Sequence, residues 1–371
     1  MRKALLLLLL TLTPLLSGCV GLYAERREVE RLRLVETLGL DPAPDGVVLS
    51  LCSSGTREEG SACYSGAGAS LSDAMERLDR LSLEDELFCG HLQHILVGRA
   101  YARQGMEGLL SAVCRSSDLR LDLPVWLILN STAQEAVCGV GDGENGVPAL
   151  LSTLQRRQEG AGALSTAGAI LRDLERQGSS LVRSLELQRS SEAEGQSLTL
   201  APAGYGVLAD GRLLAQISPE NAPAAELLTD SLSPCPLLLR DGQGRAVTLE
   251  LQGGSSELKP RWGEDGELAG LEITLRFRAA VLEIEGFPQV TDPRYLAELS
   301  AGMEAELSRR AGEVLSLSRD LGADFLGLGR RIELLSPLRG RGLGEKLGPL
   351  LGELPLRLVL RGELLHGNDI N

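Results

Sequence analysis

The longest hydrophobic stretch of the chain lies at its N-terminus, where predominantly apolar residues run from Ala4 to Leu16 directly after Arg2 and Lys3. A stretch of this length is too short to cross a bilayer, which takes about 20 residues. A short basic region followed by such a stretch is typical of a secretory signal peptide. We therefore expect residues 1–18 to be removed and the mature chain to lie outside the cytoplasm.

The hydrophobic stretch ends in Leu16-Ser17-Gly18-Cys19, in which small residues precede a cysteine. This arrangement is typical of a bacterial lipobox, in which the cysteine receives a diacylglyceryl group and becomes the first residue of the mature chain. We expect Cys19 to be the lipidation site and its acyl chains to hold the protein on a membrane, since each buried CH₂ contributes about 0.8 kcal/mol. The alternative is an ordinary signal peptide with an incidental cysteine.

After this leader, the pattern alternates between strand-like and helix-like stretches. Strands are predicted at Leu34–Leu40, Val47–Leu51, His91–Val97 and Val125–Leu129, and helices from 71, over 99–115, from about 131, and twice within 148–177. Ser70 and Asp73 predict a capping box at the start of the first helix. Ser54–Gly68 predicts a loop and Arg189–Gln196 a polar linker. The alternation favours an α/β domain over residues 19–188.

The pattern over residues 197–262 predicts a small β-rich middle domain. Ala209-Asp210-Gly211-Arg212 stands between two apolar runs, which is typical of a β-hairpin. Further along, Val247, Leu249 and Leu251 alternate with polar residues, as expected for a strand with one buried face.

The clearest pattern lies in residues 268–371. Odd positions over Leu271–Ala279 are apolar and even positions are polar, which predicts a half-buried strand; the apolar positions then shift, which indicates a bulge. Asp292-Pro293 predicts the start of a long helix that ends near Gly322, and Leu356–Leu360 predicts a last strand. We therefore expect a mixed α+β and α/β protein of three successive domains, each a β-sheet with packed helices.

Composition narrows the classes of function. The chain has 371 residues with 37 basic and 51 acidic side chains, a net charge of −14. An acidic chain lacks the basic face that nucleic-acid binding requires. Only three histidines and 3% aromatic residues leave little material for metal sites, acid–base chemistry or stacking of bases and sugars. We expect no nucleic-acid partner, no metal and no cofactor.

Two local sequences come closest to known chemical motifs. His91 and His94 would point to opposite faces of a strand, which does not favour a metal site. Gly141–Gly146 matches the spacing of a phosphate-binding loop, but it follows a predicted helix and contains two acids, which favours a surface loop. No Gly-x-Ser-x-Gly occurs, and carboxylates are too abundant for spacing to reveal a glycosidase pair. We expect no enzymatic activity.

Six cysteines follow Cys19, and none is in a Cys-x-x-Cys pair. A zinc ribbon or a thioredoxin-type motif is therefore not indicated. Export makes disulfide bonds possible, and Cys52 with Cys63 could close one loop. The other interpretation is that several of these cysteines are small buried hydrophobic residues.

Short motifs follow one another in a fixed order along the mature chain. They are Arg27-Glu28-Val29-Glu30, the apolar stretch from Leu34 that closes on Gly39-Leu40-Asp41, Phe88-Cys89-Gly90-His91-Leu92, Ala102-Arg103-Gln104-Gly105, Arg115 to Leu119-Arg120, Gly206 to Leu213, and Gly322-Ala323-Asp324-Phe325-Leu326-Gly327-Leu328-Gly329. Their order resembles the Ger(x)C family, the lipoprotein C subunits of nutrient germinant receptors in spore-forming bacteria. One departure is Val20-Gly21-Leu22, where the family often has a tryptophan after the lipidated cysteine.

The resemblance implies three mixed α/β domains and a role without catalysis. It implies a lipoprotein on the outer face of the cytoplasmic (inner spore) membrane, held through Cys19, that works with integral-membrane A-type and B-type receptor subunits to trigger germination. The family-motif residues it marks as candidates are Gly90, His91, Asp324, Gly327 and Gly329. Each is interpreted either as structural, a glycine in a tight turn or an aspartate that caps one, or as part of a partner interface.

Two other classes of protein are alternatives. A solute-binding lipoprotein of a transporter would have two similar, hinge-linked lobes around one cleft, and the order of predicted elements does not show such a pair. A lipid-anchored hydrolase would act through carboxylates, which are present in number but in no recognisable arrangement.

Overall fold

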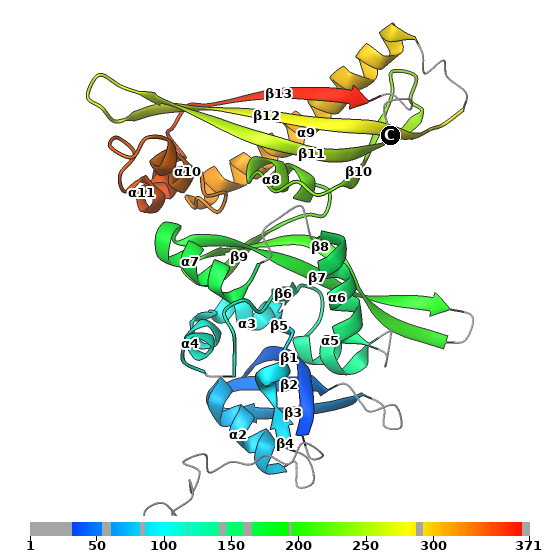
Figure 1. Cartoon of the computed structure of the whole chain (residues 1–371), viewed down its shortest axis with the longest axis vertical. Coiled ribbons are helices and arrows are strands. Elements are labelled where there is room, and N and C mark those ends of the chain that lie inside the picture. Colours follow the sequence, from blue (N-terminus) through cyan, green and yellow to red (C-terminus); the bar gives the residue numbers. More distant parts are fainter. Residues whose placement is uncertain are drawn as a thin grey trace, which may run out of the picture.

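The computed structural model describes residues 32–53, 61–81, 86–116, 118–140, 146–158, 165–192, 195–286 and 292–365. Two bodies, each built on one β-sheet, follow one another along the long axis of the molecule (Figure 1). The mixed α+β class expected from the sequence is confirmed. The expected signal peptide, Cys19 and most of the glycine-rich stretch Gly141–Gly146 lie outside the described residues.

Within the described residues, the first body has nine strands in the order β3-β2-β1-β5-β6-β7-β8-β9, with β4 beside β1. The strands are β1 (Leu32–Ala43), β2 (Gly46–Ser53), β3 (Ala62–Gly68), β4 (Glu86–Phe88), β5 (His94–Gly98), β6 (Val125–Ile128), β7 (Ser179–Glu192), β8 (Gly195–Ala209) and β9 (Arg212–Ile217). The central strands β1, β5, β6 and β7 are parallel. Every residue of β5 and β6 is buried, as expected for parallel strands covered on both faces.

Helices cover both faces of this sheet. One face carries α2 (Leu71–Leu81), α3 (Arg99–Gln104), α4 (Glu107–Arg115) and α7 (Ala167–Gln177), and the other carries α5 (Ala133–Gly139) and α6 (Val147–Gln158). Side chains along β5 point alternately to the two faces: Ile95 and Val97 are buried with α2, α3, α4 and α7, and Leu96 is buried with α5 and α6.

The second body holds a four-stranded sheet in the order β10-β11-β12-β13. Its elements are α8 (Ala222–Leu228), β10 (Cys235–Arg240), β11 (Ala246–Trp262), β12 (Leu268–Ile284), α9 (Pro293–Leu321), α10 (Leu328–Leu335), α11 (Leu343–Leu350) and β13 (Leu356–Leu365). The helices α9 to α11 connect β12 to β13, which are parallel and therefore need a long crossover. The bulge expected after Ala280 is confirmed: Thr248 pairs with Glu283 and Leu249 with Val281, so Leu282 is the extra residue.

The helix starts predicted at α2 and α9 are confirmed. At α2, the backbone N–H of Asp73 donates to Ser70 Oγ at 3.2 Å, and the carboxylate of Asp73 accepts from the backbone of Ala69 at 2.8 Å. At α9, Asp292 accepts from the backbone N–H of Arg294 at 2.9 Å. Gly322 ends α9 in the left-handed conformation, at φ 59°, that favours glycine.

Residues 197–262 differ from the expected middle domain, because they form no sheet of their own. β8 pairs with β7, and β9 with β8, in the first sheet, whereas β10 pairs with β11, and β11 with β12, in the second. The hairpin at Ala209–Arg212 is present as predicted. The described residues thus contain two sheets where three were expected, since an alternating pattern shows that a strand has a buried face but not which sheet it joins.

Two segments predicted to be irregular form strands. β3 lies in the expected loop Ser54–Gly68, and its glycines allow α2 to pack closely: a Cβ on Gly68 would lie 2.3 Å from the backbone nitrogen of Ala74. The expected linker Arg189–Gln196 lies within the β7–β8 hairpin. In Figure 1 the paired ends of these strands project from the body, where a polar sequence is compatible with a strand.

The two bodies share one hydrophobic core. Tyr205, Val207 and Ile217 of the first sheet belong to the same buried cluster as α8 and the second sheet. The Tyr205 hydroxyl also donates to the carboxylate of Glu226 on α8 at 2.6 Å. We call this contact the seam. It fixes the second body against β7, β8 and β9.

One disulfide bond occurs among the described residues, between Cys63 on β3 and Cys138 at the end of α5. The suggested Cys52–Cys63 pair is not formed, although Cys52 and Cys63 are opposite one another in the β2–β3 register. The bond therefore joins an edge strand to the helix that covers it rather than closing a local loop.

Cys63→Ser is expected to lower the free energy of unfolding by about 2–4 kcal/mol, because the bond constrains an unfolded chain over a sequence separation of 75 residues. Urea unfolding of the oxidised wild type and of the variant measures this loss. Cys114→Ser is the matched control, since Cys114 is exposed and outside the disulfide. Equal stabilities of Cys63→Ser and wild type would contradict the assignment of the bond.

Arg183→Met is expected to raise the melting temperature. Arg183 on β7 is only 4% exposed, and none of its three guanidinium nitrogens has a hydrogen-bond partner; an unpaired buried charge costs several kcal/mol. Arg310 on α9, 6% exposed, is the matched control because it donates to Glu306 and to the carbonyl of Glu220. Arg310→Met should lower the melting temperature in the same assay, and a fall with Arg183→Met would refute the argument.

Candidate functional site

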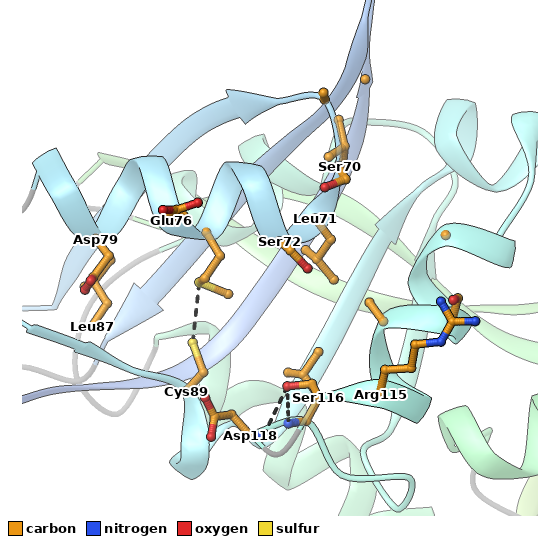
Figure 2. A pocket seen from close by; sticks show the side chains of 18 of the residues that line it. Ser70, Leu71, Ser72, Glu76, Asp79, Leu87, Cys89, Arg115, Ser116 and Asp118 are labelled. Carbon is orange, nitrogen blue, oxygen red and sulfur yellow. Dashed lines mark hydrogen bonds between the residues drawn. The ribbon is translucent and has the colours of Figure 1, made fainter. Parts of the chain in front are cut away.

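A groove of about 920 Å³ lies between α2 and α4 on one face of the first sheet (Figure 2). Residues of α2, from Leu71 to Asp79, form one wall, and residues of α4, from Gly108 to Arg115, form the other. β4 and the short turn after it close the bottom through Leu87 and Cys89. The volume falls in the range of ligand and peptide sites in proteins.

The floor of the groove is apolar. Leu71, Leu87, Cys89 and Leu119 are buried beneath it, each less than a tenth exposed. Met75 is partly buried and packs against the same core cluster, and the Cys89 thiol donates to the Met75 sulfur at 3.7 Å (Figure 2). A methionine at this place makes the floor adaptable, because its side chain changes shape at little cost.

The rim of the groove is acidic. Four carboxylates and one guanidinium line it, from Glu76, Asp79, Glu86, Asp118 and Arg115. The turn after α4 is held by Ser116, whose hydroxyl accepts from the backbone N–H groups of Asp118 and Leu119 at 3.1 and 3.3 Å. This turn places Asp118 across the groove from α2 (Figure 2).

Gly90 and His91 lie next to the groove without lining it. Gly90 allows the Phe88 ring to fold over the backbone, since a Cβ at Gly90 would lie 2.5 Å from that ring. The His91 side chain is half exposed, 3.9 Å from the carboxylate of Glu36 and 3.4 Å from the amide of Gln93. The contact at Gly90 supports its structural interpretation, and a partner interface at His91 stays a prediction.

Asp324, Gly327 and Gly329 lie together where α9 turns into α10. Asp324 is fully buried and accepts from the backbone N–H groups of Leu328 at 2.9 Å and of Gly329 at 2.7 Å. It therefore satisfies the open amides at the start of α10. Burial raises the pKa of Asp324 to about 7, although these two hydrogen bonds and the nearby Arg331 favour the charged form.

The two glycines of this late motif are required by geometry. Gly327 has φ 67°, in the left-handed region. A Cβ on Gly329 would lie 2.3 Å from the carbonyl oxygen of Leu343, so Gly329 lets α11 pack against α10. The motif thus shapes the α10–α11 pair, which also contacts α7 of the first body. Its residues and the Gly90 segment lie in different bodies and do not form one site.

The structure separates the two histidines of the weak metal pattern. His94 is 1% exposed, its Nδ1 accepts from the Trp126 indole at 3.4 Å, and its Nε2 shares a hydrogen bond with Ser152. Burial lowers the pKa of His94 to about 4, so it stays neutral at ordinary pH. The described part of the chain holds no group of three His, Cys, Asp or Glu side chains arranged to bind a metal, and no helix suited to spanning a bilayer.

Sequence reasoning did not find the groove. Its lining residues come from four separate stretches, 46–47, 69–79, 86–89 and 101–119. Two of these stretches overlap the family motifs at Phe88–Leu92, Ala102–Gly105 and Arg115–Arg120, but no motif joins the two walls, because each wall is an ordinary amphipathic helix whose inner side chains belong to the core. The exposed acids on α2 give no further signal, because the sequence does not distinguish them from a solvated face.

Asp324→Asn is expected to remove a pH dependence of stability. Since the folded pKa of Asp324 is about 7 and its ordinary value is 3.8, the folded state binds this proton more tightly than the unfolded chain does. The wild type should therefore lose stability as the pH rises between these two values, whereas the variant has no group to ionise there. Melting temperatures at about pH 5 and about pH 8 measure the difference; parallel profiles for the two chains would contradict it.

Comparison with known proteins gives results for both bodies. A family model described as the spore germination protein N-terminal domain matches residues 25–184, and one described as spore germination B3/GerAC like, C-terminal, matches residues 203–337. The crystal structure of the GerBC protein aligns with a TM-score of 0.58 at 15% sequence identity, covering 88% of this chain and 96% of that one. No curated protein matches the sequence at a significant level.

The two family models together span most of the chain; the first ends within β7 and the second begins within β8, so both include strands of the first sheet. The alignment with GerBC shows the same fold, at an identity too low to carry anything further. The motif order found in the sequence and the matched models agree: the chain belongs to the Ger(x)C family and is a C subunit of a spore germinant receptor.

Proposed function

We propose that this chain is a lipid-anchored, non-catalytic subunit that holds a nutrient germinant receptor together on the outer face of the cytoplasmic (inner spore) membrane. The observation that carries the proposal is the match of both bodies to germination-protein models behind a lipobox ending in Cys19. Integral-membrane A-type and B-type subunits are its partners. Nutrient recognition belongs mainly to those membrane subunits.

The short tether supports a role close to the bilayer. Cys19 precedes Leu32, the first residue of β1, by 13 residues. Such a segment reaches at most about 45 Å when fully extended. The first body therefore stays within reach of the extracytoplasmic parts of membrane-embedded partners.

The seam argues against the alternative of a solute-binding lipoprotein. Such proteins close two lobes on a ligand through a hinge. Here Tyr205, Val207 and Ile217 of the first body are buried in the core of the second. Opening the two bodies would expose this apolar surface, at about 25 cal/mol for each Å², so we do not expect a hinged cleft.

A deletion strain complemented with Cys19→Ala tests the anchored subunit. We expect deletion spores to fail to germinate with the nutrient that the receptor senses, wild type to restore germination, and Cys19→Ala to restore it at least tenfold less efficiently. Loss of the acyl chains releases the protein from the membrane, because a body without them lacks that buried apolar contact. Germination rate and the amount of protein in the spore membrane fraction are measured together.

Cys114→Ala is the matched control, because Cys114 is exposed and lies outside the disulfide. It should restore germination as wild type does. Normal germination of the deletion strain across many nutrients, or full rescue by a Cys19→Ala chain that is absent from the membrane, would refute the anchored-subunit proposal.

A further inference from the structure

We propose that the groove between α2 and α4 is the docking site for a basic amphipathic helix of a membrane-embedded partner subunit. The inference rests on the proposed function, because it takes the chain to work beside membrane proteins. It adds the surface that the chain uses and the chemistry of what binds there. The groove has the form of a helix-binding site, two helical walls over an apolar floor.

The size of the groove fits a short stretch of helix. A helix about 10 Å wide with a pitch of 5.4 Å occupies on the order of 400 Å³ a turn. The groove of about 920 Å³ therefore accommodates about two turns. Two turns present three or four side chains on one face, enough to cover the floor at Leu71, Met75 and Leu87.

The charge of the rim selects a basic partner. Glu76 and Asp79 on one side and Asp118 on the other give the groove a negative rim, and Arg115 is the one cation among the described residues that line it. Arg80, which does not line the groove, forms an ion pair with Glu76, so Asp79 and Asp118 contribute most of the negative charge. A helix with apolar residues on one face and Lys or Arg on its flanks would place its cations against these carboxylates. An acidic or uncharged helix would gain only the apolar contact.

One end of the groove lies beside Leu32, the first described residue of the chain. Leu32, the first residue of β1, pairs with Glu86 of β4, and Glu86 lines the groove. Adjacent paired strands lie about 5 Å apart. With a lipid at Cys19, the groove therefore lies on the side from which membrane-embedded subunits approach.

Two other occupants fit the charge less well. The tether itself, residues 20–31, carries three arginines and three glutamates and has no net charge to set against the rim. A second copy of the mature chain, which lacks Arg2 and Lys3, would bring a net charge of −14 − 2 = −16 to an acidic groove. A basic amphipathic segment from a different polypeptide would match both the apolar floor and the acidic rim of the groove.

The test is co-purification of the A-type and B-type subunits with the tagged full-length lipoprotein from detergent-solubilised membranes. Glu76→Lys with Asp79→Lys reverses the charge of the α2 rim, and Ser72→Trp fills the groove without changing its charge. Ser72, Glu76 and Asp79 are exposed, so folding and melting temperature should be unchanged. We expect each groove variant to recover at least tenfold less partner than wild type.

The matched control is Glu345→Lys with Glu353→Lys, an equal charge reversal at exposed positions of the second body. It should recover partner as wild type does. A photo-crosslinking amino acid at Ser72 should capture a partner peptide rich in Lys or Arg with apolar residues at helical spacing. Capture of an acidic peptide, of the tether or of a second copy would overturn the proposal.

The outcomes separate the two proposals. If wild type recovers no A-type or B-type subunit, the receptor-subunit proposal fails, and the groove proposal fails with it. If wild type and both groove variants recover the same amount, only the groove proposal is overturned. Equal recovery with loss of germination in the groove variants would overturn it in favour of a small ligand in the groove.

Discussion

The arrangement of the molecule depends on the seam, where one face of β7, β8 and β9 is buried against the second body. Tyr205, Val207 and Ile217 contribute their side chains to a core whose other members come from α8, the second sheet and α9 to α11. The first sheet is therefore covered on this face partly by its own helices and partly by the second body. The first body has two further buried clusters of its own, whereas the core of the second body is completed by side chains of the first.

The late sequence motif, Gly322–Gly329, also contributes to the contact between the two bodies. Gly327 and Gly329 allow α10 and α11 to pack closely, and Asp324 accepts hydrogen bonds from backbone N–H groups at the start of α10. The pair then contacts α7 of the first body. A buried carboxyl with a pKa near 7 is tolerated there because two backbone N–H groups and Arg331 partly offset its desolvation. These contacts support the structural interpretation of Asp324, Gly327 and Gly329.

Local chemistry was predictable from the sequence and long-range pairing was not. The caps of α2 and α9 and the bulge at Leu282 were predicted because their signals lie within a few residues. The division of residues 197–262 between two sheets was missed, since a half-buried strand has the same pattern in either sheet. The Cys63–Cys138 bond was missed for a related reason: its partners are 75 residues apart, and spacing favours near neighbours. The groove joins four separate stretches, and the short motifs within two of them do not show that these stretches meet.

The groove and the late motif lie at opposite ends of one continuous layer of helices. α2 contacts α4, α4 contacts α7, and α7 contacts both α10 and α11 (Figure 1). Spatial continuity of this kind does not by itself carry a signal, which would need an element with two stable arrangements. The layer is packed on a sheet with buried central strands, and the seam ties the second body to it. A partner bound at the groove would therefore orient the whole protein as a rigid body, and would bring the α10–α11 face to a defined place in the receptor.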